Sequence, residues 1–155
     1  MPTSFRIFKT KHAAGWFDGE GACLYGGRWN SRGMRLLYTS ATLSLATLEV
    51  LVNINSVKLL SLYSFAAAEF DENHVLDIEN PASLPKNWSD SPAPIAIQNI
   101  GDEWARARAS LVLKVPSSVT PTENNFLINV EHPDFTELKL GPVIPFNFDG
   151  RLLTR

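Results

Sequence analysis

The chain of 155 residues contains a single cysteine, Cys23, so it can form neither an internal disulfide nor a thiolate zinc cluster. One free thiol is typical of a reducing compartment. No apolar run reaches the ~18 residues of a membrane-spanning helix, and the N-terminus lacks the apolar core of a signal peptide. These absences lead us to expect a cytoplasmic protein without a membrane segment.

Positive charge is also scarce, because 14 basic and 16 acidic side chains leave a net charge of −2. A basic surface is the usual mark of a nucleic-acid-binding protein, so we expect no direct contact with nucleic acid. The sequence has no P-loop, no G-x-G-x-x-G and no G-x-S-x-G. Its three histidines are scattered without metal-ligand spacing, so no metal site is predicted, and a lone loop histidine such as His12 is more often not catalytic.

The residues that are present predict one globular domain over 1–155, with 45% hydrophobic and 10% aromatic residues. Apolar patterns bounded by turn residues predict strands at 4–9, 35–39, 57–63, 75–78, 111–115, 124–129, 136–140 and 144–148. A helix is expected over 95–110, with Trp104 and Ala107 facing inward. The glycine-containing segment 11–21 is expected to be a loop whose aromatics either cover a pocket or pack onto the core, and 81–94 is a proline-rich loop.

The most informative stretch begins with Gly26 and Gly27, which permit a tight turn or the close approach of a ligand. The guanidinium of Arg28 follows at once and can hold a phosphate or carboxylate through two hydrogen bonds. Further along, the ring of Tyr38 can stack on a flat heterocycle or hydrogen-bond to it. This order of residues predicts an anion-binding turn next to an aromatic side chain.

An apolar helix is predicted after this stretch, with N-cap oxygens offered by Thr39, Ser40 and Thr42. Its buried face is expected to consist of Leu45, Leu48, Leu51 and Val52. Glu49 stands beside that face as the only charged residue from Leu36 to Val57. A carboxylate in such a place must find a partner or change its protonation, so the spacing leaves open a structural ion pair, a position at the edge of the stripe, or a functional acid.

Together, Arg28, Tyr38, Glu49 and a downstream serine suit a phosphorylated sugar substrate with a cationic leaving group. The arginine would hold a pyrophosphate, and the carboxylate would stabilise positive charge on an anomeric carbon. Spacing alone makes this one chemistry among several.

Several motifs of the chain resemble the RES domain family, over about Phe5 to Leu140. The resemblance rests on GGRWN at 26–30, YTS at 38–40, LATLE at 45–49, VPS at 115–117, NNFLIN at 124–129 and HPDF at 132–135. The arginine, glutamate and serine for which the family is named correspond to Arg28, Glu49 and Ser117. Ser110 and Ser118 lie nearby, which leaves the choice of serine open.

The resemblance implies an α+β fold similar to that of ADP-ribosyltransferases, with a mixed or split β-sheet core and flanking helices. It also implies the toxin of a bacterial toxin–antitoxin pair that uses NAD⁺ as its substrate and needs no metal. The implied partner is an Xre-type antitoxin with a helix-turn-helix region, and the toxin is expected to be a homodimer.

Two activities are compatible with that resemblance. One is cleavage of NAD⁺ at its nicotinamide–ribose bond, with water or phosphate as acceptor, and the other is transfer of ADP-ribose to a protein. A non-enzymatic module that binds the antitoxin is a third alternative. By resemblance the catalytic residues are Glu49, Arg28, Tyr38 and Ser117, with Glu49 as the key acid and Ser117 helping to position the substrate. NAD⁺ is expected to be bound by Arg28, Tyr38, Gly27, Asn30 and Ser40.

Overall fold

The structure, a computed structural model, describes residues 1–54, 62–78 and 81–152 of the chain. Its centre is a sheet of eight strands within these ranges, in the order β4-β5-β6-β2-β1-β3-β7, with β8 also paired to β3. The strands are β1 Thr3–Lys9, β2 Leu36–Ser40, β3 Tyr63–Glu69, β4 Val75–Asp77, β5 Val112–Pro116, β6 Asn124–Asn129, β7 Lys139–Leu140 and β8 Ile144–Phe146. The β4–β5 pair is parallel and the other pairs are antiparallel, so the sheet is mixed.

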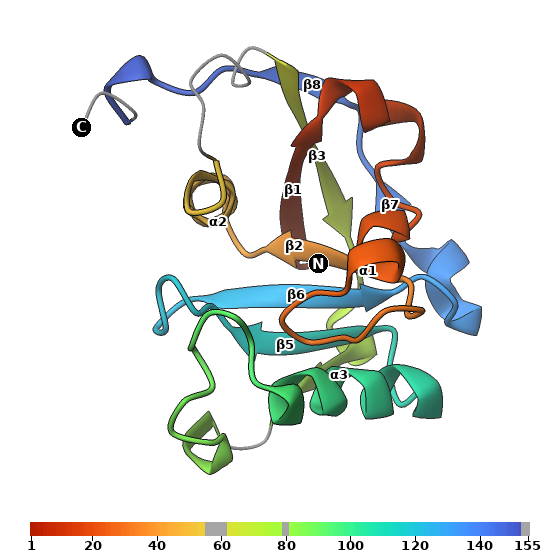
Figure 1. Ribbon diagram of the computed structural model, residues 1–155. Coiled ribbons are helices and arrows are strands. Elements are labelled where there is room, and N and C mark those ends of the chain that lie inside the picture. The colour runs from red at the N-terminus through yellow and green to blue at the C-terminus, as the bar shows by residue number, and fades with distance from the viewer. Residues whose placement is uncertain (55–61, 79–80, 153–155) are drawn as a thin grey trace.

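The sheet bends sharply where β2 meets β1. These two strands are joined at a single pair of register partners, Phe5 and Ser40, whereas β1 runs beside β3 along its whole length. In Figure 1, β1 and β3 stand nearly upright above the layer formed by β2, β6 and β5. The bend gives the sheet a concave side on which residues from both halves come together.

Three α-helices flank the sheet in the described ranges, namely α1 Glu20–Tyr25, α2 Leu43–Leu51 and α3 Ile95–Ala107. Helix α3 lies below the β5–β6 layer, and α2 lies on the other side of that layer, facing β1 (Figure 1). This arrangement confirms the expected α+β class with a mixed sheet and flanking helices. No helix in the described part of the chain is long and apolar enough to cross a membrane.

Helix α3 packs through Ile97 and Trp104 against strand residues such as Leu127. Trp104 is buried as predicted, but the inward placement of Ala107 is wrong, because that residue is exposed. The helix ends there, with Arg108 in the left-handed conformation at φ 50°. The last turn therefore leaves the core, and the following strand begins at Val112.

Helix α2 begins as expected, since the Thr42 side chain accepts a hydrogen bond from Leu45 N at 3.0 Å. Its predicted buried face is only partly correct. Leu45 is buried, but Leu48 and Val52 are 40% and 61% exposed. Leu45, Glu49 and Val52 lie on one stripe of the helix, and that stripe runs from the core to an open cavity rather than staying under the sheet.

The segment 11–21 is more ordered than the expected loop, because it contains a 3₁₀ helix at Thr10–Gly15 and the start of α1. Its aromatics pack onto the core. The Trp16 ring is buried and stacks on the Phe8 ring, with the two ring centroids 5.7 Å apart. His12 is exposed on the 3₁₀ helix.

The strand predictions are mostly confirmed in position, with three differences. Residues 57–61 of the strand predicted at 57–63 lie outside the described residues, and β3 instead begins at Tyr63. The strand predicted at 136–140 is shortened to Lys139–Leu140, because Pro133–Glu137 forms a 3₁₀ helix. The last strand ends at Phe146 rather than at 148.

Candidate active site

The glycine turn that carries Arg28 is closed by a bridge between Gly27 and Asn30. Gly26 has φ 73°, a left-handed conformation that glycine adopts without strain. Gly27 is required for a different reason, since a Cβ atom there would lie 2.5 Å from the Tyr38 hydroxyl oxygen. The two glycines therefore shape the turn and let Tyr38 approach its backbone.

Half-buried Tyr38 and fully buried Asn30 form a hydrogen-bonded pair behind this turn. The Tyr38 hydroxyl donates to Asn30 Oδ1 at 2.6 Å and accepts from Trp29 N at 3.0 Å. Asn30 is fully buried, and its Nδ2 donates to the carbonyl oxygens of Ala22 and Ser31. Burial raises the pKa of the Tyr38 phenol above its ordinary value.

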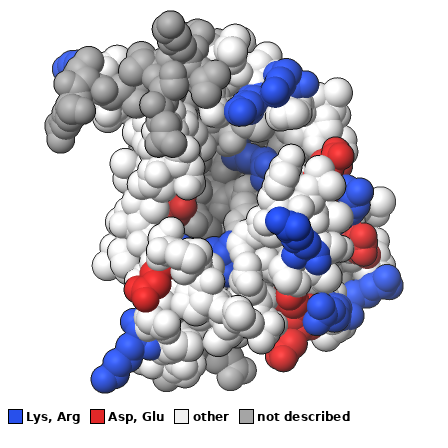
Figure 2. All heavy atoms as spheres, viewed as in Figure 1, with Lys and Arg blue, Asp and Glu red and all other residues white. Residues whose placement is uncertain are grey.

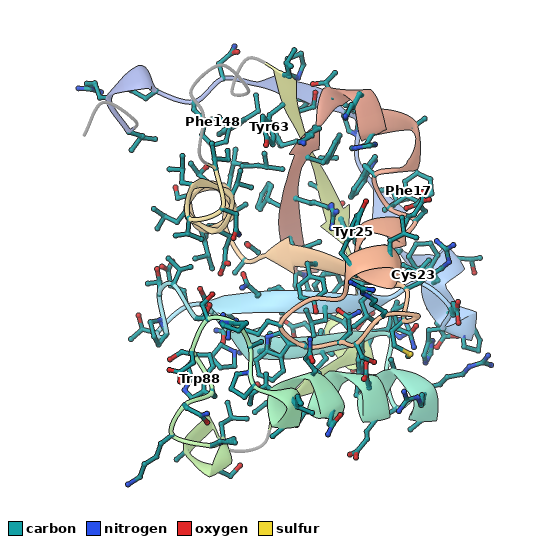
Figure 3. The ribbon with its side chains drawn as sticks, in the orientation of Figure 1. Phe17, Cys23, Tyr25, Tyr63, Trp88 and Phe148 are labelled. Atoms are coloured by element: carbon teal, nitrogen blue, oxygen red, sulfur yellow. The ribbon has the colours of Figure 1, made fainter. Side chains whose placement is uncertain are left out.

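Arg28 is held by the long loop that precedes α3. Its Nη1 donates to the carbonyl oxygens of Trp88 at 3.1 Å and Asp90 at 2.7 Å. Nε and Nη2 of the same guanidinium have no hydrogen-bond partner among the described residues, so they are free to bind a ligand. Figure 3 shows Trp88 on this loop, below the layer of β5 and β6.

Glu49 is held by side chains from the sheet. Its Oε1 accepts from Ser117 Oγ at 2.6 Å and from Asn125 Nδ2 at 2.8 Å. Ser117 is fully buried and in turn accepts from the backbone N–H groups of Val119 and Thr120. Of the three interpretations left open by the sequence, the structural ion pair is not seen within the described ranges, where no cation pairs with Glu49.

These groups meet in one cleft that has two connected parts. The larger part has a volume of about 930 Å³ and the smaller part about 390 Å³, and Arg6, Tyr38, Glu49 and Asn53 line both. The larger part is also lined by Arg28, Gly27 and Tyr25. Further lining residues are Ser89, Ser91, Pro92 and Ala93 of the long loop, with Ser118 and Val119. Figure 2 shows this face hollowed between α2 and α1, with basic side chains in and around the hollow.

Arg6 of β1 is a basic residue of the cleft that was not predicted as a site residue. Its Nη1 donates to the Tyr38 carbonyl oxygen at 3.3 Å, whereas its Nε is buried without a hydrogen-bond partner in the described part of the chain. Burial lowers the pKa of this guanidinium, although Asp18 partly opposes the effect. A buried cation with an unpaired N–H gains from an anionic ligand.

The structure divides the predicted site residues into two groups. Arg28, Tyr38, Gly27 and Glu49 line the larger part of the cleft, and Ser40 lines the smaller part. Asn30 and Ser117 are fully buried behind the lining and contact Tyr38 and Glu49 respectively.

The candidate serines are separated by the same geometry. Ser110 bonds to Trp104 and to the Val112 carbonyl oxygen, away from the cleft. Ser118 lines the larger part, and Ser117 alone of the three bonds to Glu49.

Asn125 and Gln98 were not predicted as site residues, and both contact the site directly. Asn125 bonds to Glu49, and Gln98 Nε2 donates to the Gly27 carbonyl oxygen at 3.0 Å. The sequence offers little signal for them, because a polar side chain in a strand or helix is too common a feature to identify a site.

Comparison with known proteins identifies the class. The family model of the RES domain matches residues 3–149, and the chain belongs to this family. A protein named Toxin Res from Yersinia enterocolitica is 39% identical over 149 residues, which cover 96% of this chain and 97% of that protein. The Prs ADP-ribosylating toxin of a Sphingobium strain is 35% identical over 162 residues, covering 100% and 99% of the two chains.

A solved structure shares the fold. A chain in the crystal structure of the M. tuberculosis MbcT–MbcA toxin–antitoxin complex superposes with a TM-score of 0.77 over 94% of this chain and 84% of that one. The sequence identity is 19%, so this similarity concerns the fold alone.

Proposed function

We propose that this protein is the toxin of a bacterial toxin–antitoxin pair and that it cleaves NAD⁺ between nicotinamide and ribose. Full-length similarity to proteins named Toxin Res and Prs ADP-ribosylating toxin supports the proposal. ADP-ribosylation breaks the same nicotinamide–ribose bond of NAD⁺. The observation that carries the proposal is a single cleft that brings the Glu49 carboxylate together with the guanidinium groups of Arg28 and Arg6.

The diphosphate of NAD⁺ would be held by the two arginines. Arg28 offers Nε and Nη2 of a guanidinium already fixed through Nη1, and Arg6 adds a second positive charge to the lining of the cleft. Both side chains line the larger part of the cleft, whose volume of about 930 Å³ suits a dinucleotide. The Tyr38 hydroxyl is committed to Asn30, so what Tyr38 offers to the substrate is its ring.

The nicotinamide of NAD⁺ is a cationic leaving group and needs no proton to depart. Its C–N bond to ribose breaks with the electron pair moving to the ring nitrogen, which releases neutral nicotinamide and leaves an oxocarbenium-like ribose. Glu49 supplies negative charge beside that ribose in the transition state. The acceptor then forms a bond to the anomeric carbon and loses its proton to solvent.

Water or phosphate is the acceptor in this proposal, and a protein side chain is the acceptor in a second candidate function. The second candidate is favoured by the relative named Prs ADP-ribosylating toxin, which this chain matches over its full length. Both use the same cleft and the same acid, and they differ in what enters the site after nicotinamide has formed.

Product analysis tests the proposal. Purified protein without antitoxin is incubated with NAD⁺, with and without phosphate, and the products are separated by liquid chromatography and mass spectrometry. We expect nicotinamide together with ADP-ribose or its 1″-phosphate. In a lysate with labelled NAD⁺, a macromolecular adduct identifies the second candidate. Intact NAD⁺ and no adduct after prolonged incubation would contradict both and favour a non-enzymatic module that binds the antitoxin.

The proposed partner is an Xre-type antitoxin with a helix-turn-helix region, and the toxin itself is proposed to be a homodimer that acts in the cytoplasm. A structural neighbour seen in a toxin–antitoxin complex supports the presence of an antitoxin partner. The net charge of −2 favours contact with DNA through the partner. Co-expression with the product of the neighbouring gene, followed by light scattering, would reveal both the pairing and the number of toxin chains.

A further inference from the structure

Two polar side chains lie behind Glu49 on adjacent strands. Ser40 is the last residue of β2 and Asn125 lies near the start of β6, and the two are register partners in the antiparallel pair. Ser40 Oγ donates to Asn125 Oδ1 at 2.8 Å, and Asn125 Nδ2 donates to Glu49 Oε1 at 2.8 Å. A continuous chain of hydrogen bonds therefore runs from the end of β2 to the carboxylate.

The direction of this chain follows from the chemistry of the three groups. A carboxylate oxygen accepts, so Asn125 presents its NH₂ group to Glu49 and its carbonyl oxygen to Ser40. Because that carbonyl oxygen can only accept, the Ser40 hydroxyl must be the donor in this hydrogen bond. A reversed amide would place Asn125 Oδ1 against Glu49 Oε1, where two acceptors repel each other. The carboxylate of Glu49 therefore sets the orientation of the amide, and Ser40 holds the far end of that amide in place.

The same arrangement makes the two oxygens of Glu49 unequal. Oε1 receives hydrogen bonds from Asn125 in β6 and from Ser117, the residue that follows β5. Oε2 has no hydrogen-bond partner among the described residues, and Glu49 lines both parts of the cleft. The protein therefore holds one oxygen and leaves the other for the substrate.

We propose that Ser40 and Asn125 are positioning residues, which fix the Glu49 carboxylate so that its Oε2 faces the ribose of the substrate. This proposal rests on the proposed function of Glu49. It gives Ser40 a role different from the direct contact with NAD⁺ expected from the family resemblance. Ser40 is only 5% exposed, and its proton is already used within the protein.

Steady-state kinetics of nicotinamide release separates a positioning role from substrate binding. Ser40→Ala should lower kcat about tenfold with KM within about twofold, because the loss of one neutral hydrogen bond frees the Asn125 amide. Ser40→Thr, which keeps the hydroxyl, should restore kcat. Ser44→Ala, on the exposed side of α2, is the matched control and should behave as the wild type.

Asn125→Asp tests the other half of the chain of hydrogen bonds. It replaces a donor by a second carboxylate beside Glu49, and like charges disfavour the ionised pair. We expect the acid limb of the kcat–pH profile to move to higher pH by about one unit or more. Asn125→Ala should lower kcat about 10- to 100-fold without this movement. If circular dichroism shows that an Asn125 variant is unfolded, the kinetics of Ser40→Ala and Ser40→Thr test the proposal instead.

Three results would overturn the proposal. They are an unchanged kcat in Ser40→Ala, a raised KM with kcat unchanged, or a crystal structure of Ser40→Ala in which the Asn125 amide and the Glu49 carboxylate keep their positions. The crystal structure does not depend on turnover. If the wild-type protein releases no nicotinamide, the proposed function itself is contradicted. Failure of the positioning role can therefore be told apart from failure of the proposed function.

Discussion

The two sides of the cleft hold opposite charges in different ways. Glu49 is fixed by side chains at the ends of two paired strands, Ser117 after β5 and Asn125 in β6. Arg28 sits on a glycine turn and is tied to two carbonyl oxygens of an irregular loop. Strands of a sheet move less than loops, so the acid is held rigidly and the cation adjusts with its loop.

The difference suggests a division of labour within one site. An acid that stabilises a short-lived charge needs an exact position, because misplacement by about 1 Å can lower the rate about 10²-fold. A cation that holds a flexible diphosphate tolerates movement. Substitutions on the acid side should therefore change mainly kcat, and those on the cation side mainly KM.

The acid side should give the largest effect. Glu49→Gln keeps the size of the side chain and removes its charge, so we expect kcat for NAD⁺ cleavage to fall by about 10²–10³-fold. Circular dichroism should show an unchanged fold. Glu103→Gln, the same change at an exposed position on α3, is the control and should retain full activity. Equal turnover by Glu49→Gln and wild type would remove Glu49 from the mechanism.

The cation side should respond through binding. Arg28→Ala removes charge-assisted hydrogen bonds worth about 1.5–3 kcal/mol, so KM for NAD⁺ should rise by about 10–100-fold while kcat changes by less. Arg28→Lys should be intermediate, because an ammonium keeps the charge but not the planar fork. Arg106→Ala, exposed on α3, serves as the control. A fall in kcat at constant KM would mean that the two sides do not differ as proposed.

The acid and cation sides also differ in how far the sequence predicts them. Arg28 follows two glycines, and Glu49 stands alone in an apolar helix, so both residues are conspicuous in the sequence itself. The Thr42 cap and most strands are equally accessible, because capping and alternation are local properties. Local patterns thus suffice for the residues that carry the charges.

The residues that hold these charges in place could not be predicted in the same way. Arg6 and Asn125 each look like an ordinary polar residue of a half-exposed strand, and their partners lie 32 and 76 residues away. Helix α1 could not be predicted because it is only six residues long and Gly21 lowers its propensity, although it is stabilised by the fold around it. The positions of these residues depend on the bend of the sheet, which brings distant segments of the chain together and cannot be read from a local pattern.

The glycine turn on the cation side offers a test of stability rather than of rate. Gly27→Ala would push a methyl group to 2.5 Å from the Tyr38 hydroxyl oxygen, so the Tyr38–Asn30 pair must shift. Overpacking of this kind costs about 1–3 kcal/mol, measurable by urea unfolding. Gly21→Ala in helix α1, where nothing lies within 4 Å, is the control and should be neutral or stabilising. A loss in Gly27→Ala no greater than in the control would contradict the close approach.

The smallest effect is expected from the Tyr38 phenol at alkaline pH. Burial raises its pKa in the folded protein above the value of about 10 in an unfolded chain. Below pH 10 the phenol is neutral in both states, so it adds no pH dependence. Above pH 10 the unfolded chain releases the proton and the folded protein keeps it, so the free energy of unfolding falls by up to about 1.4 kcal/mol per pH unit.

Comparison with Tyr38→Phe isolates this contribution, since the variant keeps Tyr25 and Tyr63 and loses only the ionisable group at position 38. The variant should be less stable at neutral pH, because Asn30 Oδ1 and Trp29 N each lose a hydrogen-bond partner. The difference in free energy of unfolding between wild type and variant should then shrink between about pH 10 and 11. Only the wild type loses stability there, because its folded state retains a proton that the unfolded chain releases. A deficit that stays constant over this range would mean that the phenol is as free to ionise in the folded protein as in the unfolded chain.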